Sequence, residues 1–562
     1  MSNHRIFIFA VCLAVGISGF LTAQESRLNL PVFPSVDEVL ERFSQGEMDG
    51  YGAGEMLFWN DKTDTESIRT VYDELASQGV KQTFFYPTFG LASEYLSEEF
   101  FREFERSLAE AKRRGMKLWL YDEYSWPSGF AGGKLIEALP TAAASSLAFS
   151  GLAVDTDTAL PENALAVYRR EDNRWRNITQ EVKEKSVTEP NALLVVRNRA
   201  GREDRLAGGV YCDMLQKGVT EKFIELTHEG YLKHSGGEFG KTIPGIFTDE
   251  MTLCRCGPFP WTDDLPEWFE KKFGYSIFEV LPLLSDGADT VLPDGRTVTS
   301  FEARHHYLST LLDLIVQRWS KPIFRFCEEH DIVATGHYEE HLWASMVHNV
   351  DAASLYVWEQ QPAIDLIFNQ WSDAQNGQAG NDRMVRELGS VASQTNRQRA
   401  SAETSGAAGW GILPSDLKRL TDWLFVLGVT HPMEMGPQFS VRGGRKFDEG
   451  PSLFYHMPYW SDYHLLLRYN QRVSYLLSQG RRPVDTLILQ PTTTLWKYLY
   501  RGSLCEKTAS SFCDLVKKCE AAQIEYEIGN ENIMAQLGSA KEAGILSIGP
   551  ARYRRVVLPE KL

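Results

Sequence analysis

The chain has 562 residues, of which 43% are hydrophobic and 24% are charged, a composition typical of globular proteins. Its length exceeds that of a single ordinary hydrophobic core, so we expect one large domain and at least one smaller one. The formal net charge of −17 disfavours nucleic acids and anionic membranes as partners, because binding phosphate groups needs a positive field.

The first 23 residues have the layout of a signal peptide. A basic start at residues 1–5 leads into an apolar run at 6–21 and then into Thr22-Ala23-Gln24, which predicts cleavage after Ala23. The alternative is an uncleaved anchor, although the run is short for a membrane span. Either way we expect a secreted or periplasmic protein. With no second stretch of spanning length, we expect no membrane span in the mature chain.

Residues 24–480 repeat one pattern, in which a short β-branched or aromatic run precedes an amphipathic helical segment. Such alternation predicts parallel β/α units. Strand ends are expected at residues 57–60, 84–86, 118–121, 245–250, 333–337, 355–358, 399–403 and 428–431. Eight strand ends fit a closed (β/α)8 barrel of the TIM type better than an open sheet, which has no preferred strand number.

Two further segments depart from this pattern. Residues of about 145–215 contain short strand-like runs separated by polar, turn-rich sequence, which predicts a small β-rich insertion. Residues 481–562 restart the α/β alternation and resemble the opening of a flavodoxin-like α/β domain. Since the sequence stops just after a strand, we expect this domain to be partial, with a truncated C-terminus.

Polar residues at the carboxyl ends of the strands matter most, because the active sites of such barrels lie there. Two carboxyl groups facing each other across a pocket are what glycoside hydrolysis requires. Glu403 stands out because it follows a strand-like run and precedes a Gly-rich loop that ends at Trp410. The candidate catalytic residues are Glu403, Glu339, Glu340, Glu250 and Glu434. The candidate substrate-binding residues are Asn60, Asp122, Glu123, Trp126, Asp249, His337, Asp365, Trp410 and His431.

Cofactor motifs are sparse. The sequence has no P-loop, no dinucleotide fingerprint between a strand and a helix, and no G-x-S-x-G elbow, so neither a nucleotide nor an organic cofactor is expected. His337, Glu339 and His341 alternate along one strand face, but no further ligand motif supports a transition metal. Calcium suits a site rich in carboxylates better.

Several ordered motifs between residues of about 50 and 480 resemble the glycoside hydrolase family 106, the α-L-rhamnosidase family. The most specific is Asp-Glu-Tyr-Ser-Trp-Pro-Ser-Gly at 122–129, accompanied by Phe-Thr-Asp-Glu at 247–250, Gly-His-Tyr-Glu-Glu at 336–340 and Ala-Glu-Thr-Ser-Gly at 402–406. The resemblance implies an inverting glycosidase with a calcium ion near the sugar. By position it implies Glu403 as general base, Glu339 or Glu340 as general acid, and Glu434 as a supporting residue, with Glu339 and Glu434 as metal ligands.

The sequence therefore predicts an exported glycoside hydrolase that removes a terminal sugar, such as α-L-rhamnose, from an oligosaccharide or polysaccharide. Two alternatives stay open. One is a retaining enzyme with Glu250 as acid/base and Glu403 as nucleophile. The other is a glycan-binding protein that kept the pocket without the chemistry.

Overall fold

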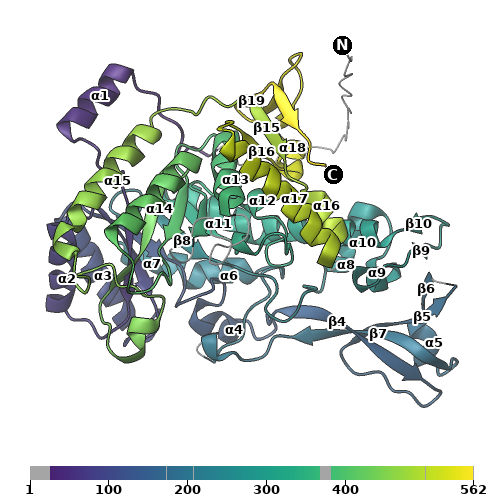
Figure 1. The fold of residues 1–562 in the computed structure, drawn as a ribbon. Coiled ribbons are helices and arrows are strands. Elements are labelled where there is room, and N and C mark those ends of the chain that lie inside the picture. Colours follow the sequence, from purple (N-terminus) through teal and green to yellow (C-terminus); the bar gives the residue numbers. More distant parts are fainter. Residues whose placement is uncertain (1–25, 173, 207, 367–380, 500–501, 561–562) are drawn as a thin grey trace, which may run out of the picture.

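The computed structural model describes residues 26–172, 174–206, 208–366, 381–499 and 502–560. The predicted signal peptide lies outside these residues. The central feature is an eight-stranded parallel sheet surrounded by helices (Figure 1). Its strands, in chain order, are β1 (Gly54–Trp59), β2 (Gln82–Pro87), β3 (Lys117–Tyr121), β8 (Gly245–Asp249), β11 (Val333–His337), β12 (Ala363–Leu366), β13 (Ser401–Thr404) and β14 (His431–Gln438).

The sheet order is β11, β8, β3, β2, β1, β14, β13, β12, so each neighbour in the chain is also a neighbour in space. The segment entering β12 returns to β11, where the backbone N–H of Gln361 donates to the carbonyl of Ala334 (3.1 Å). Inward-facing side chains such as Met56, Phe84 and Trp119 fill the interior. The predicted (β/α)8 barrel is confirmed.

Helices form the outer layer and return the chain from one strand to the next (Figure 1). Helix α3 illustrates how the local sequence sets the start and the buried face of these helices. Ser97 caps its first turn by accepting from the N–H of Phe100 (3.2 Å), and the apolar side chains of Phe100, Phe104 and Leu108 recur on one buried face. The helices of this layer are α2 (Thr65–Ser77), α3 (Glu98–Arg113), α6 (Val219–Leu226), α7 (His228–His234), α8 (Leu265–Phe273), α10 (Ser300–Ile315), α11 (Lys321–Glu329), α13 (Asn381–Gln394), α14 (Pro414–Leu427) and α15 (Tyr463–Leu477).

Two of the expected strand positions are wrong. Residues 355–358 do not form a strand: α12 (Ala352–Tyr356) covers their start, and the sixth barrel strand follows at Ala363–Leu366. A short apolar run reads alike in a buried helix and a buried strand, which explains the error. Residues 428–431 were expected to end the eighth strand, but they lead into it, because β14 begins at His431.

Between β3 and β8 the chain leaves the barrel and forms a separate antiparallel sheet, which projects to one side in Figure 1. Its strand order is β4 (Ser145–Val154), β7 (Glu189–Arg199), β5 (Ala164–Glu171) and β6 (Arg174–Asn177). A small apolar core that includes Val154, Val167 and Val182 stabilises it. Short elements nearby are α4 (Lys134–Ala138), α5 (Thr179–Lys183), α9 (Leu281–Ser285), β9 (Thr290–Val291) and β10 (Thr297–Val298).

The C-terminal region forms a three-stranded parallel sheet in the order β16 (Glu527–Gly529), β15 (Thr486–Leu489), β20 (Arg555–Val557). Arg386 of α13 joins it to the barrel through an ion pair with Glu520 (2.7 Å). Its remaining elements are α16 (Thr492–Tyr498), α17 (Gly502–Ala521), α18 (Glu531–Leu537), β17 (Gly538–Ser539), β18 (Leu546–Ile548) and β19 (Ala551–Tyr553). Near the N-terminus, α1 (Val36–Gln45) contacts α15.

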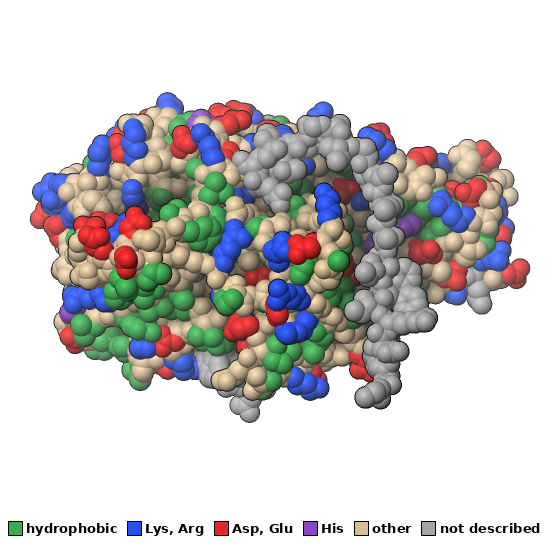
Figure 2. All heavy atoms as spheres, turned by 90° about the horizontal axis from the view of Figure 1, so that it is seen from above, with side chains coloured by type: hydrophobic (Ala, Val, Ile, Leu, Met, Phe, Trp, Pro, Cys, Tyr) green, Lys and Arg blue, Asp and Glu red, His purple; other side chains and the backbone are tan. Residues whose placement is uncertain are grey.

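Acidic and basic side chains are interspersed on the face of the molecule seen in Figure 2, so the negative net charge does not gather into one patch there. Among the described residues, no helix combines the length and the apolar character that crossing a bilayer requires.

Candidate active site

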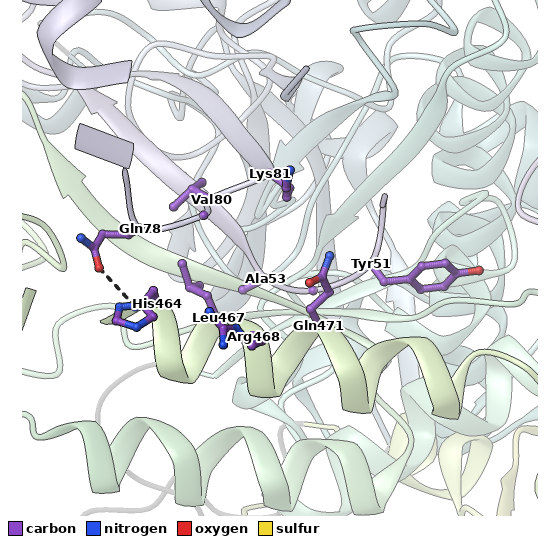
Figure 3. Close-up of a pocket in the computed structure, with 11 residues that line it drawn as sticks. Tyr51, Ala53, Gln78, Val80, Lys81, His464, Leu467, Arg468 and Gln471 are labelled. Carbon is purple, nitrogen blue, oxygen red and sulfur yellow. Dashed lines mark hydrogen bonds between the residues drawn. The ribbon is translucent and has the colours of Figure 1, made fainter. Parts of the chain in front are cut away.

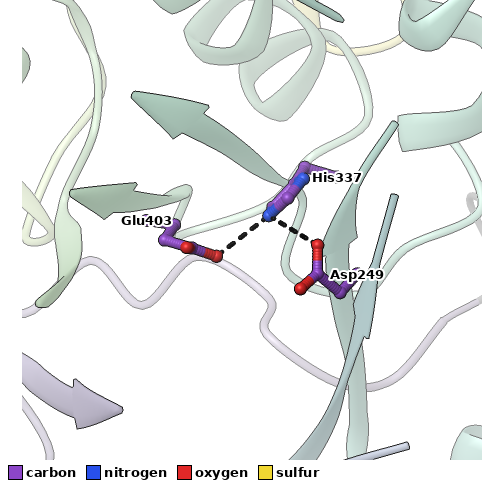
Figure 4. A group of neighbouring side chains, drawn as sticks. All are labelled: Asp249, His337 and Glu403. Carbon is purple, nitrogen blue, oxygen red and sulfur yellow. Dashed lines mark hydrogen bonds and ion pairs between the residues drawn. The ribbon is translucent and has the colours of Figure 1, made fainter. Parts of the chain in front are cut away.

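Three buried side chains meet at the carboxyl ends of barrel strands β8, β11 and β13. His337 lies between Asp249 and Glu403: its Nε2 is 3.0 Å from Glu403 Oε2 and 3.6 Å from Asp249 Oδ1 (Figure 4). All three side chains point into the barrel mouth because each occupies an inward position near the end of its strand. The structure therefore brings together residues that are distant in the sequence.

Gly336 allows β11 to approach β8 closely. A β-carbon at this position would lie 2.2 Å from the carbonyl oxygen of Thr248, far inside normal contact distance. Below the site, the rings of Tyr86 and Tyr121 stack with their centroids 3.8 Å apart, and the Tyr121 hydroxyl donates to Asp249. The floor of the site is thus a packed aromatic layer.

A second group of polar side chains lies beside the first. Glu250 follows β8, Asp365 lies near the end of β12, and His341 lies in the turn after β11; one ligand-type atom from each lies within 4.8 Å of the others. The indole N–H of Trp126 donates to Glu250 Oε2 (2.5 Å). Glu250 Oε1 is 3.8 Å from Nδ1 of His337, which links the two groups.

Glu339 and Glu340 have different surroundings. Both carboxylate oxygens of Glu340 accept from backbone N–H groups, those of Tyr338 (2.9 Å) and Asp365 (2.6 Å), so this side chain holds the ends of β11 and β12 in place. Glu339 has a positive φ of 52° and pairs with Nδ1 of His348 at 2.9 Å. Glu339 is the more exposed of the two, and the catalytic role of Glu340 stays a prediction.

Glu434 and His431 lie away from the barrel mouth. Glu434 occupies an outward position on β14, level with Thr404 and Glu55, and accepts from the hydroxyls of Thr404 (2.8 Å) and Ser405 (3.1 Å). Strand alternation therefore turns it away from the barrel mouth. His431 starts β14 at the opposite end of the barrel, where Nδ1 lies 3.0 Å from the hydroxyl of Ser401.

Asp122, Glu123 and Asn60 are buried, and their side chains hydrogen-bond to neighbouring residues, while their substrate-binding role stays a prediction. Glu123 accepts from the backbone N–H groups of Tyr124 and of residues 129–132, at 2.6 to 3.1 Å. Asp122 accepts from the hydroxyls of Ser128 and Thr248. The Asn60 amide both donates to and accepts from the backbone of Ser440 (3.0 Å each). These polar groups are already engaged.

Trp410 lies on the loop after β13 and is 39% exposed. Its indole N–H donates to the carbonyl of Lys446 at 2.8 Å, which ties this loop to the loop after β14. A role for the Trp410 ring as a surface for the C–H face of a sugar stays a prediction.

Sequence reasoning missed two residues of this region. His348, the partner of Glu339, lies on a loop without a motif. Glu449, on the loop after β14, has a pKa raised by burial and by the negative charges of Asp249 and Glu403, which places it near them. The one available signal was its position after the eighth strand, next to Asp448 and before Gly450-Pro451.

The electrostatics of the site are dominated by burial and by mutual repulsion of carboxylates. Burial and the charge of Glu403 raise the pKa of Asp249 to about 7 despite the counteracting charge of His337. Burial raises the pKa of Asp365 well above its usual range, and Glu403 adds to this. Burial opposes the charged form of His337, but Glu403 and Asp249 outweigh it and raise its pKa. The pocket therefore favours a bound proton or cation.

The predicted calcium ligands do not converge. Glu434 faces the outer side of the barrel and Glu339 pairs with His348, and in the described part of the chain neither belongs to a group of three converging ligand atoms. A calcium site built on these two glutamates therefore does not fit this structure.

A separate cavity of about 170 Å³ lies near the amino ends of β1 and β2 and is closed on one side by α15 (Figure 3). Tyr51, Lys81 and Gln471 line it, and the Gln78 side chain accepts from the backbone N–H of His464 (3.3 Å). It lies at the opposite end of the barrel from Glu403. Since active sites of this fold lie at the carboxyl ends of strands, we do not assign it to catalysis.

Acidic side chains gathered at the carboxyl end of a (β/α)8 barrel are the arrangement that the barrel glycosidases use. The sequence model of glycoside hydrolase family 106, described as alpha-L-rhamnosidase, matches residues 191–551, more than half of the chain. The protein belongs to this family and is a glycoside hydrolase, which confirms the resemblance. No curated protein matches the sequence.

Solved structures support the fold. A rhamnosidase from Novosphingobium sp. PP1Y is similar with a TM-score of 0.67 and 14% identity, over 94% of this chain and 67% of that one. The GH42 β-galactosidase Gan42B from G. stearothermophilus, in the form of a catalytic mutant, is similar with a TM-score of 0.52 and 10% identity, over 85% of this chain and 65% of that one. A β-galactosidase from Rahnella sp. R3 is similar with a TM-score of 0.51 and 11% identity, over 86% of this chain and 66% of that one. The chain spans about two thirds of the length of these proteins.

Proposed function

We propose that the protein is an exported glycosidase that removes a terminal sugar from a glycan, with an α-L-rhamnoside as the first substrate to test. Family membership supports hydrolysis and favours it over the non-catalytic binding protein. The name of the family supports rhamnose, and the signal-peptide layout of residues 1–23 supports export. N-terminal sequencing of the protein from the medium or periplasm tests the export: a start at Gln24 supports it, and an intact Met1 contradicts it.

The observation that carries the catalytic assignment is the position of Glu403. It lies near the end of β13 at the mouth of the barrel, where its Oε2 is held 3.0 Å from His337 Nε2. A fixed carboxylate in a buried pocket is suited to act as general base. We propose this role for Glu403.

Glu339 is the proposed general acid, because Glu340 is engaged by backbone N–H groups and Glu434 faces away. Burial opposes the charged form of Glu339, but its hydrogen bond with His348 outweighs burial and lowers its pKa, so the proposal requires that substrate binding raises this pKa. Inverting glycosidases keep their two carboxyl groups about 6.5–9.5 Å apart, and retaining enzymes about 5–5.5 Å. We propose the inverting mechanism because the chain belongs to the family whose resemblance implies it, and the anomer of the first product tests it.

Two experiments test the proposal. The purified protein is assayed against a panel of nitrophenyl glycosides; release from the α-L-rhamnoside alone supports rhamnose, and release from another sugar contradicts it. Proton NMR of the first product then reads the anomer. Inversion supports Glu339 with Glu403. Retention contradicts this pair and favours Glu250 as acid/base with Glu403 as nucleophile.

A further inference from the structure

Arg255 lies on the loop between β8 and α8, beside the residues of the barrel mouth. Its guanidinium carbon is 4.7 Å from the ring centre of Trp126 and 5.9 Å from that of Tyr211. Hydrogen bonds fix both rings, since Trp126 donates to Glu250 Oε2 (2.5 Å) and Tyr211 donates to the carbonyl of Ser128 (2.6 Å). A positive charge is therefore held against two aromatic rings, one side chain away from Glu250.

Two of the three nitrogens of this guanidinium have no partner. Among the described residues, no acceptor lies within hydrogen-bonding reach of Arg255 Nε or Nη2, and both atoms are buried. The third nitrogen, Nη1, is 3.9 Å from Glu203 Oε2, an ion pair that is too long for a hydrogen bond. Buried N–H groups are normally paired, because an unpaired one destabilises the fold. The two free nitrogens therefore indicate an acceptor that the folded chain does not supply itself.

The free nitrogens form one edge of the guanidinium. The N–H of Nε and one N–H of Nη2 point the same way, and their spacing matches the two oxygens of a carboxylate. Arg386 uses this edge within the same molecule: its Nε is 2.7 Å from Glu520 Oε1 and its Nη2 is 3.1 Å from Glu520 Oε2. The edge of Arg255 thus fits a carboxylate from outside the chain.

The depth of Arg255 relates it to one part of a glycan. Its side chain is 16% exposed, whereas those of Glu403 and Glu250 are 5% and 7% exposed. A terminal sugar that is cleaved at Glu403 occupies the deeper part of the mouth, so the rest of the glycan extends toward solvent. Arg255 therefore lies where the second sugar of the chain would be bound.

Charge supports the same assignment. Acidic side chains dominate the barrel mouth, so a negatively charged sugar would be repelled unless a cation compensated for its charge. Arg255 supplies such a cation at the rim, and its planar group is already oriented by Trp126 and Tyr211. Because this guanidinium is held in place before the ligand arrives, little side-chain freedom is lost on binding.

We propose that Arg255 binds the carboxylate of a uronic acid, the sugar next to the one that is removed. Nε and Nη2 donate one hydrogen bond to each carboxylate oxygen. The inference rests on the proposed function and deepens it, because it names the class of glycan on which the enzyme acts. Arg255 is a binding residue and takes no part in proton transfer.

The test compares two disaccharides that share a terminal α-L-rhamnose and the same linkage. Their second sugar is glucuronic acid in one and glucose in the other, so a carboxylate replaces a CH₂OH group. The kcat/KM of the full-length parent should be at least about tenfold higher for the uronate, the effect of one hydrogen bond between charged groups. A third disaccharide with glucose 6-sulfate separates a sulfate ester from a carboxylate, and a preference for the sulfate would contradict the proposal.

Variants assign the preference to Arg255. Arg255→Gln should abolish the ratio between the uronate and the neutral disaccharide. Arg255→Lys keeps the charge but loses the parallel N–H groups, so it should restore only part of the ratio. Arg442→Gln is the matched control, because this arginine lies on the loop after β14 and its Nη2 is already engaged by Asp61 (2.6 and 2.9 Å). The control should keep the ratio of the parent. Circular dichroism and thermal unfolding show whether each variant folds.

Equal kcat/KM values for the two disaccharides in the parent overturn this inference and leave the proposed function intact, as does an unchanged ratio in Arg255→Gln. If neither disaccharide is hydrolysed, the proposed function fails by itself and binding tests the inference. Calorimetric titration of the parent should then give a Kd at least about tenfold lower for the uronate, and Arg255→Gln should remove this difference. Binding that does not discriminate between the two disaccharides would overturn the inference as well.

Discussion

Nε2 of His337 lies 3.0 Å from Oε2 of Glu403, although the two residues are 66 positions apart in the chain. The contact exists because β11 and β13 end at the same mouth of one barrel and both side chains occupy inward positions. It joins the proposed general base to a histidine whose other ring nitrogen, Nδ1, lies 3.8 Å from Glu250 Oε1.

The first prediction concerns Glu403 and Glu434. Glu403→Gln should reduce kcat by about 10²- to 10⁴-fold, because an amide cannot accept the proton from water. Glu434→Gln is the matched control: it lies on the neighbouring strand but faces outward, so kcat should stay within a few-fold. Sugar release from whichever nitrophenyl glycoside is a substrate measures both. Equal losses in the two variants would contradict the assignment.

The second prediction concerns the loop at residues 127–133. The Glu123 carboxylate accepts hydrogen bonds from five backbone N–H groups. In glutamine an NH₂ group replaces one oxygen, and this group cannot accept a hydrogen bond from a backbone N–H. Glu123→Gln should therefore lower the free energy of unfolding by about 1–3 kcal/mol for each donor left unpaired. Denaturant unfolding measures it. The exposed Glu137→Gln should change stability little, and a similar small change in Glu123→Gln would refute the structural role.

The third prediction concerns the approach of β11 to β8. Gly336→Ala places a methyl group 2.2 Å from the Thr248 carbonyl, so the strands must separate and His337 must move. We expect a loss of about 1–3 kcal/mol in stability, as in other overpacked cores, together with a large loss of sugar release. Thermal unfolding and the glycosidase assay check the two effects. Gly480→Ala, where a methyl group meets no atom within 4 Å, is the control.

The fourth prediction is a pH dependence away from the active site. Burial raises the pKa of Asp213 to about 6, and one of its carboxylate oxygens has no partner among the described residues. A folded-state pKa above the unfolded value means that ionisation opposes folding, so this contribution to stability falls as pH rises from about 4 to 6.

The variant Asp213→Asn cannot ionise and should be more stable than the parent at pH 8, by up to about 3 kcal/mol. The difference should vanish below about pH 4, where Asp213 is neutral in both the folded and unfolded states. Denaturant unfolding of the parent and the variant between about pH 4 and pH 8 measures this difference in stability. A stability difference that does not change with pH would mean that Asp213 does not titrate in this window.

The sequence alone was sufficient for the barrel, because each β/α unit carries its own signal: a buried run, a polar strand end and an amphipathic helix such as 98–113. It was also sufficient to identify the family and to place Glu403 at the mouth of the barrel. It failed at 355–358, where a short apolar run does not distinguish a buried helix from a strand.

The tertiary structure alone decided which acidic residues share a pocket. Alternation of side chains along a strand turns Glu434 outward, and the register of β14 puts His431 at the far end of the barrel. Backbone N–H groups from separate segments engage Glu340 and Glu123, while loops without motifs supply His348 and Glu449. These outcomes depend on strand register and on contacts between distant segments, and neither is encoded in the local pattern of residues around each carboxylate.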